Sequence, residues 1–176
     1  TELISWSAAF LDQPVFDETE HQKFLRQQAT LLHDIAWADH PDHRAELASA
    51  RVLFANIAGV THYQRMYMAT IVHHRYTSGT LSDRSAKIVR LEEEDLLRAR
   101  IIGATIRLGL TLSGGVAHLL PKTELRLDDK ALHLTLPVNL AHLNGEAVEK
   151  RLEKLASILG NWPGITISDV AVKLKD

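Results

Sequence analysis

Residues 31–76 read LLHDIAWADHPDHRAELASARVLFANIAGVTHYQRMYMATIVHHRY, and the interpretation of the whole chain depends most on this stretch. It contains six of the ten histidines of the protein, together with four arginines. From Leu47 to Ser82 there is no Asp or Glu, although acidic residues are common elsewhere in the chain. Such a cluster can hold a metal ion or a phosphorylated ligand, or it can serve only the packing of the fold.

The spacing of apolar residues predicts that this stretch lies in a bundle of helices. Asp17 and Glu20 resemble a capping box at the start of the first helix, and Thr61 can cap a later one. The helix that follows Thr61 is apolar on nearly every side, so we expect it to be central and buried. The predicted helices span residues 18–38, 45–57, 61–76 and 91–112, with a loop over residues 77–85.

After Gly115 the hydrophobic period changes to two, which is typical of strands. The predicted elements are two strands of a β-hairpin over residues 125–127 and 132–136, and a helix that follows Asn144-Gly145 and is closed by Gly160. A last strand runs from Ile165 through Val170, Val172 and Leu174, with a bulge in it. The expected fold class is therefore α+β, mainly α. We expect a helical domain over residues 1–115 and a small ββαβ subdomain over residues 116–176.

The composition is that of an ordinary globular protein, with 45% hydrophobic residues, 24% charged residues and a net charge of −2. The absence of Cys excludes disulfides, thiolate metal sites and cysteine nucleophiles. No apolar run reaches the ~18 residues of a membrane span, so we expect no membrane partner and a cytoplasmic location. The chain starts at Thr1 rather than at Met, which suggests a processed protein or a piece of a longer one. No phosphate-binding glycine loop and no G-x-S-x-G elbow is present, so no catalytic site is evident.

The pair His33-Asp34 resembles the metal-binding pair of the HD phosphohydrolase superfamily, where a divalent metal activates water for attack on a phosphate ester. That site also needs a histidine from an earlier helix. His21 is the only earlier histidine, and twelve helical residues put it roughly 18 Å from His33, too far to share one ion. We therefore favour no metal site, with His33 and Asp34 as a degenerate pair, unless His40, His62 or His73 supplies the missing ligand.

A structural interpretation of the pair stays open beside the metal site. His33 would then be half-buried, bonded to a backbone carbonyl or stacked on Trp37. Asp34 would pair with Arg26 or with a neighbouring histidine.

The acid-free span favours anion contact more than metal binding. Arg51, Arg65 and Arg75 have no acidic neighbour in the sequence, and the planar fork of Arg suits phosphate oxygens. A second acid-free span, from Leu96 to Thr123, carries further basic residues, and the two helices together predict a positive groove. The alternative is that these arginines pair with distant acids such as those in residues 92–95. Nucleic acid is not favoured, because few aromatic residues lie near the basic ones.

Several motifs together resemble the C-terminal region of bacterial exopolyphosphatases of the Ppx/GppA phosphatase family. The resemblance covers nearly the whole chain, and each motif alone is weakly specific. The motifs are residues 31–37 and 40–44, residues 59–65, His74-Arg75-Tyr76, residues 98–104 with Arg107-Leu108, Leu120-Pro121 and Arg151-Leu152.

This resemblance implies that the helical domain is HD-like and that the N-terminal ATPase-fold domains, with their catalytic Glu and Mg²⁺ site, are absent from this chain. It implies no catalytic residue and no cofactor here. The parent enzyme would release terminal orthophosphate from inorganic polyphosphate, and could also hydrolyse guanosine pentaphosphate (pppGpp). The chain would contribute polyphosphate binding and, as part of a homodimer, dimerisation. The candidate phosphate contacts are His40, His43, Arg44, His62, Arg65, His74 and Arg75.

Two alternatives remain open at this point. An independent HD-type phosphohydrolase would depend on a metal ion, whereas a pure dimerisation module would ignore anions.

Overall fold

The computed structural model describes residues 2–128, 131–160 and 162–168. The chain divides into two compact units. Unit 1 comprises Thr1–Asp17 and Arg107–Asp176, and unit 2 comprises Glu18–Ile106. The predicted division into residues 1–115 and 116–176 stays a prediction. The two compact units have other boundaries than this predicted division, because the N-terminal helix packs with the sheet of unit 1.

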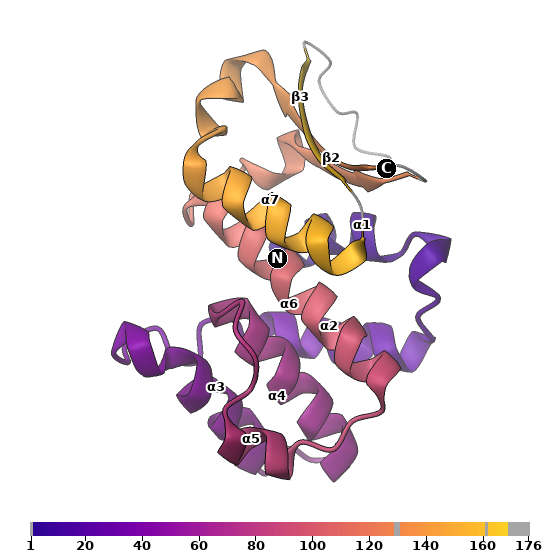
Figure 1. Ribbon diagram of the computed structural model, residues 1–176, viewed down its shortest axis with the longest axis vertical. Coiled ribbons are helices and arrows are strands. Elements are labelled where there is room, and N and C mark those ends of the chain that lie inside the picture. The colour runs from indigo at the N-terminus through magenta and orange to yellow at the C-terminus, as the bar shows by residue number, and fades with distance from the viewer. Residues whose placement is uncertain (1, 129–130, 161, 169–176) are drawn as a thin grey trace. The chain divides into compact units, whose positions relative to one another are not determined.

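Unit 2 is helical, and its centre is a helix that contacts the two helices before it (Figure 1). Its elements are α2 (Glu20–Leu31), η2 (Pro41–His43), α3 (Arg44–Phe54), α4 (His62–Tyr76), α5 (Asp83–Ile88) and the first part of α6 (Glu93–Ser113). Every residue of α4 from Met66 to His74 is buried, so the prediction that this helix is central is confirmed. Thr61 caps it, because its hydroxyl accepts a hydrogen bond from the N–H of Gln64.

The first predicted helix is wrong at both ends. It begins after Thr19, whose hydroxyl accepts from Gln22, so the capping box is Thr19–Gln22 rather than Asp17–Glu20. It ends at Leu31, and the segment that follows runs in tight turns with bonds to the third residue back, such as Trp37 N–H to Asp34 C=O at 3.0 Å. Side chains of α3 bind this segment, because Arg44 and Arg51 donate to its Asp39 and Ile35 carbonyls.

Unit 1 combines helices with a three-stranded sheet. Its elements are α1 (Glu2–Leu11), η1 (Pro14–Phe16), the rest of α6, η3 (Leu120–Lys122), β1 (Glu124–Leu127), β2 (Ala131–Pro137), η4 (Val138–Leu143), α7 (Glu146–Leu159) and β3 (Trp162–Ser168). The strand order is β1-β2-β3; β1 and β2 pair antiparallel as the predicted hairpin, and β2 and β3 pair parallel. A parallel pair needs a crossover connection, and α7 provides it (Figure 1).

The core of unit 1 lies on one face of this sheet. Leu125 on β1 and Leu132, Leu134 and Leu136 on β2 are buried, whereas the residues between them are more exposed. α7 packs on β2 and β3, and α1 packs on β1 and η3. Trp6 of α1 donates its indole N–H to the Thr123 hydroxyl at 3.0 Å, which satisfies both buried groups.

The expected fold class, α+β and mainly α, is confirmed. The predicted loop over residues 77–85 ends earlier, because α5 already begins at Asp83. The predicted continuation of the last strand through Val170, Val172 and Leu174 lies outside the described residues. Within the described ranges, no helix is both long enough and apolar enough to cross a membrane.

Candidate functional site: an arginine cluster in unit 2

Arg75 is a nearly buried cation at the end of α4. Its side chain is 20% exposed, and its guanidinium lies 3.9 Å above the centroid of the Tyr76 ring. One nitrogen, Nη2, donates to Asp34 Oδ1 at 3.2 Å, and the buried Nε finds no hydrogen-bond partner among the described residues. A guanidinium carries five N–H donors, so this environment leaves much of its hydrogen-bonding capacity unused.

Two further arginines come from α3 and bind the turn segment that follows α2. Arg44 donates Nε–H to the Asp39 carbonyl at 2.8 Å. Arg51 donates to the Ile35 carbonyl at 2.8 Å and forms a two-nitrogen ion pair with the Asp39 carboxylate. The same turn segment donates the Ala36 N–H to the Tyr76 hydroxyl at 3.2 Å, which brings the end of α4 against it. Arg44, Arg51 and Arg75, named here the arginine cluster, therefore surround one turn segment.

The positive charge of the arginine cluster exceeds the negative charge of the carboxylates beside it. Burial lowers the pKa of Arg75, and the nearby charge of Arg44 acts in the same direction, while Tyr76 and Asp34 oppose it. Arg51 is better compensated, since its hydrogen bond with Asp39 raises the pKa of Arg51 and lowers that of Asp39. Among the described residues no carboxylate forms an ion pair with Arg44. Three guanidinium groups thus share the two carboxylates of Asp34 and Asp39.

Arg51 and Arg75 pair with acids that are distant in the sequence, as the alternative interpretation allowed, but the partners come from the turn segment before α3 rather than from residues 92–95. Arg98 likewise pairs with Glu94, one turn earlier on α6, at 2.6 Å. At least one arginine of the second acid-free span therefore has an acidic partner. Arg26 pairs with Glu18 rather than with Asp34.

His33 and Asp34 do not form a metal site with a third ligand. The Nδ1 atom of His33 lies 2.8 Å from the Thr30 carbonyl, and its Nε2 lies 3.2 Å from Asp34 Oδ2. The other carboxylate oxygen of Asp34 is engaged by Arg75. Within the part of the chain that the structure describes, no three His, Asp or Glu side chains gather as ion ligands. The 2.8 Å contact of His33 Nδ1 with the Thr30 carbonyl agrees with the structural interpretation of this histidine.

The remaining candidate residues are spread along unit 2. His40 precedes η2 and His43 is its last residue, directly before Arg44, and their ring centroids are 5.8 Å apart. His62 and Arg65 lie at the other end of α4, where Arg65 donates to the Val60 carbonyl at 2.8 Å. Ten helical residues separate Arg65 from Arg75, a rise of roughly 15 Å. The structure thus brings Arg44 and Arg75 together and leaves His62 and Arg65 apart from them.

His74 belongs to the interior of unit 2. It is 6% exposed, and burial lowers its pKa to about 3, with His73 and Arg100 adding to the effect. Gly103 of α6 packs so closely here that an added Cβ would lie 2.6 Å from the Cβ of His74 and 2.6 Å from the Ile71 carbonyl oxygen. His74 is therefore neutral at pH 7 and packed between helices.

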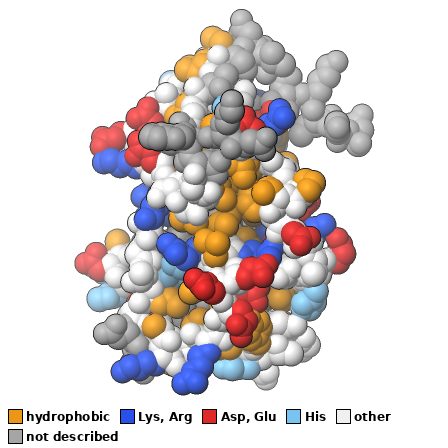
Figure 2. Space-filling view, turned by 45° about the vertical axis from the view of Figure 1, so that its right-hand side comes forward, with side chains coloured by type: hydrophobic (Ala, Val, Ile, Leu, Met, Phe, Trp, Pro, Cys, Tyr) orange, Lys and Arg blue, Asp and Glu red, His pale blue; other side chains and the backbone are white. Residues whose placement is uncertain are grey.

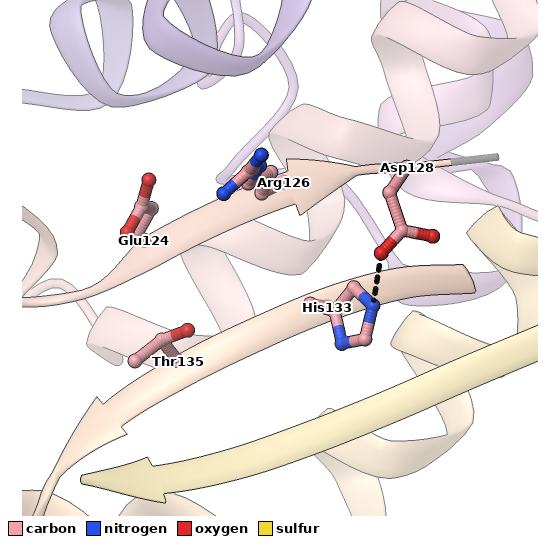
Figure 3. Close-up of a pocket in the computed structure, with 5 residues that line it drawn as sticks. All are labelled: Glu124, Arg126, Asp128, His133 and Thr135. Atoms are coloured by element: carbon pink, nitrogen blue, oxygen red, sulfur yellow. Dashed lines mark hydrogen bonds and ion pairs between the residues drawn. The ribbon is translucent and has the colours of Figure 1, made fainter. Parts of the chain in front are cut away.

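Sequence reasoning missed a second group of polar side chains, on the exposed face of the sheet in unit 1. Glu124, Arg126 and Asp128 of the β1 side and His133 and Thr135 of β2 line an open hollow (Figure 3). Asp128 and His133 point toward each other, with Oδ2 and Nε2 2.9 Å apart, and Asp128 Oδ1 also accepts the Ala131 N–H. The alternation of the hairpin could have placed all five on one face. Because two carboxylates flank the one arginine, this hollow does not favour an anion.

On the face shown in Figure 2, basic and acidic side chains are interspersed with exposed hydrophobic ones, so no field of a single sign covers that face. Arg51 belongs to the arginine cluster and Tyr76 lies beside Arg75, but neither was among the predicted phosphate contacts. The signal for Arg51 was present, because it stands in the acid-free span at helical spacing from Arg44.

The comparisons with known proteins agree with the motif-based resemblance. A search of curated proteins finds no match. The family model described as "Exopolyphosphatase, C-terminal" matches residues 1–164, nearly the whole chain. The chain belongs to the exopolyphosphatase C-terminal domain family.

Proposed function

We propose that this chain binds the phosphate chain of inorganic polyphosphate through the arginine cluster of unit 2, as an accessory domain of an exopolyphosphatase. One observation supports this most strongly. Arg75 is largely buried yet has a single 3.2 Å contact to a carboxylate, and Arg44 beside it has none among the described residues. Burying a cation without full compensation is costly, so such a site favours an anion that supplies the missing acceptors.

Phosphate oxygens fit the donors that the cluster leaves unused. Guanidinium groups bind phosphate through paired N–H bonds, and a polyphosphate presents a row of such oxygens. The exposed His40 and His43 precede Arg44 directly and can extend the contact along a chain-like ligand. We therefore centre the proposed contacts on Arg44 and Arg75, with His40 and His43 beside them. Arg65 and His62 would touch only a ligand that spans the length of α4, and His74 would need to leave the interior.

In this proposal the release of terminal orthophosphate takes place in another part of the parent enzyme, where Mg²⁺ would also bind. The present chain guides the substrate and does no chemistry. Whether the parent accepts pppGpp as well depends on that catalytic part. The alternative, an independent metal-dependent phosphohydrolase, needs several metal ligands, and within the described residues no three His, Asp or Glu side chains gather as ion ligands.

Calorimetric titration with short-chain polyphosphate at low ionic strength tests the proposal. We expect binding that weakens as salt is added, because salt screens charges. Arg75→Ala should weaken it about tenfold or more, the usual value of a hydrogen-bonded charge contact. Arg126→Ala, which removes an exposed arginine from the sheet of unit 1, is the matched control and should leave the affinity unchanged. Flat titrations of the wild-type chain, or equal losses in both variants, would contradict the proposal.

A second candidate function, dimerisation, is supported by exposed apolar side chains. Trp37 and Phe54 are 72% and 71% exposed, and Leu47 lies two turns before Phe54 on the same face of α3. Large apolar groups in this number are typical of protein contact surfaces. Sedimentation of the wild-type chain and of Trp37→Ser/Phe54→Ser tests this. A dimer that dissociates in the double variant would support it, and a wild-type monomer at high concentration would contradict it.

A further inference from the structure

The carboxylate of Asp34 occupies the position in the arginine cluster that an anionic ligand needs. It lies 3.2 Å from Arg75 Nη2, and no other carboxylate among the described residues forms an ion pair with Arg75. A phosphate oxygen that approached the same guanidinium nitrogen would meet a negative charge already there. Two like charges at one donor repel each other, so ligand and side chain compete.

The two carboxylates of the cluster are held very differently. Asp39 is fixed by both terminal nitrogens of Arg51, and its side chain is 19% exposed. Asp34 is 61% exposed and accepts one hydrogen bond of 3.2 Å from Arg75. Its other oxygen lies 3.2 Å from His33 Nε2. A single exposed ion pair contributes little free energy, so Asp34 can leave Arg75 at small cost, whereas Asp39 cannot leave Arg51 as easily.

We propose that Asp34 is a displaceable internal counter-ion: its carboxylate covers Arg75 when no ligand is present and is displaced when a polyphosphate binds. The inference rests on the proposed function, because it concerns the regulation of the same site. In this role Asp34 competes with an anionic ligand and does not serve as a metal ligand. Asp34 lowers the affinity of the cluster for anions and thereby sets a threshold of ligand charge. A single phosphate displaces it poorly, whereas a chain that also reaches Arg44 gains a second guanidinium in exchange.

Removing the charge of Asp34 tests this directly. Calorimetric titration of Asp34→Asn with short-chain polyphosphate should show binding tighter by about two- to fivefold than wild type, in keeping with the strength of an exposed ion pair. With orthophosphate as the probe, the relative gain should be similar, because either ligand has to displace the same carboxylate from Arg75. Asp42→Asn is the matched control. It removes an equally negative, exposed carboxylate from the neighbouring η2 turn, where Asp42 lies 3.7 Å from His40, and it should change the affinity less.

Asp34→Ser removes the same charge through a different side chain and should reproduce the gain, which guards against a folding defect in one variant. Unchanged or weaker binding in both Asp34 variants, or an equal gain in Asp42→Asn, would overturn the inference. These outcomes are separate from a failure of the proposed function, in which the wild-type chain itself binds no polyphosphate.

Discussion

The two units of this chain handle polar side chains in opposite ways. Unit 1 buries an apolar core of leucines under its sheet and carries charged side chains on the exposed face of that sheet. Unit 2 buries Arg26, His73 and His74, and Arg75 is only 20% exposed. Burying charge and imidazole costs free energy, so unit 2 depends on the contacts that compensate these groups, whereas the core of unit 1 depends on apolar packing.

The largest expected difference concerns buried ion pairs. Arg26 and Glu18 are 2% and 1% exposed and lie 2.9 Å apart, so Arg26→Met would remove a guanidinium from a buried carboxylate. We expect a loss of about 3–5 kcal/mol in the free energy of unfolding, measured by urea denaturation. Lys150→Met breaks an exposed pair with Glu146 in unit 1 and should cost less than about 0.5 kcal/mol. Similar losses in both variants would remove the contrast between the units.

The next difference concerns helix packing at two glycines of α6. An added Cβ at Gly103 would meet backbone and Cβ atoms of α4 at 2.6 Å, which cannot move aside easily. Gly103→Ala should therefore cost about 2 kcal/mol or more. At Gly109, in unit 1, the added Cβ would meet the end of Leu3 at 2.8 Å and the ring of Trp6 at 2.9 Å, which can shift. Gly109→Ala should cost less than Gly103→Ala in thermal unfolding, and the reverse order would show that unit 2 is the looser one.

The two units should also differ in how much they make the free energy of unfolding depend on pH, and this effect is of intermediate size. The pKa of His74 is about 3 in the folded chain and about 6.5 when unfolded, so between these values only the unfolded chain takes up the proton. Stability must then fall as the pH drops below about 6.5, by about 1.4 kcal/mol per pH unit from this group. Burial lowers the pKa of His73 too, which adds in the same direction.

His74→Gln should therefore retain about 2 kcal/mol that wild type loses between pH 6.5 and pH 5, as measured by urea denaturation at the two pH values. His142→Gln replaces an exposed histidine of unit 1 and is the control. If both variants keep the wild-type slope, the acid sensitivity does not come from the interior of unit 2.

The smallest effect is expected on the sheet face of unit 1. His133→Ser removes the 2.9 Å contact to Asp128, but the carboxylate still accepts the Ala131 N–H. Both side chains are partly exposed, so we expect a change of about 0.5 kcal/mol in unfolding free energy and no change in polyphosphate affinity. A marked loss of affinity would assign anion binding to unit 1.

Local sequence signals predicted the elements well wherever no tertiary donor intervened. The alternating leucines of the hairpin, the Thr61 cap and the apolar α4 all follow from spacing. The turn segment after Leu31 did not follow from spacing, and its Ile35 and Asp39 carbonyls accept hydrogen bonds from Arg51 and Arg44 of α3. The same long-range contacts assemble the arginine cluster from α3, α4 and the turn segment. The sequence pattern indicates where the positive residues are, but only the folded structure shows which of their side chains lie close together.

Nuclear magnetic resonance of the isotope-labelled chain during titration with tripolyphosphate tests the central claim most directly. Our account predicts that the amide signals of residues 34–44 and the side-chain Nε–Hε signals of Arg44 and Arg75 shift with ligand, while those of the sheet residues 124–135 stay in place. Shifts confined to the sheet residues, or no shifts at low salt, would contradict it.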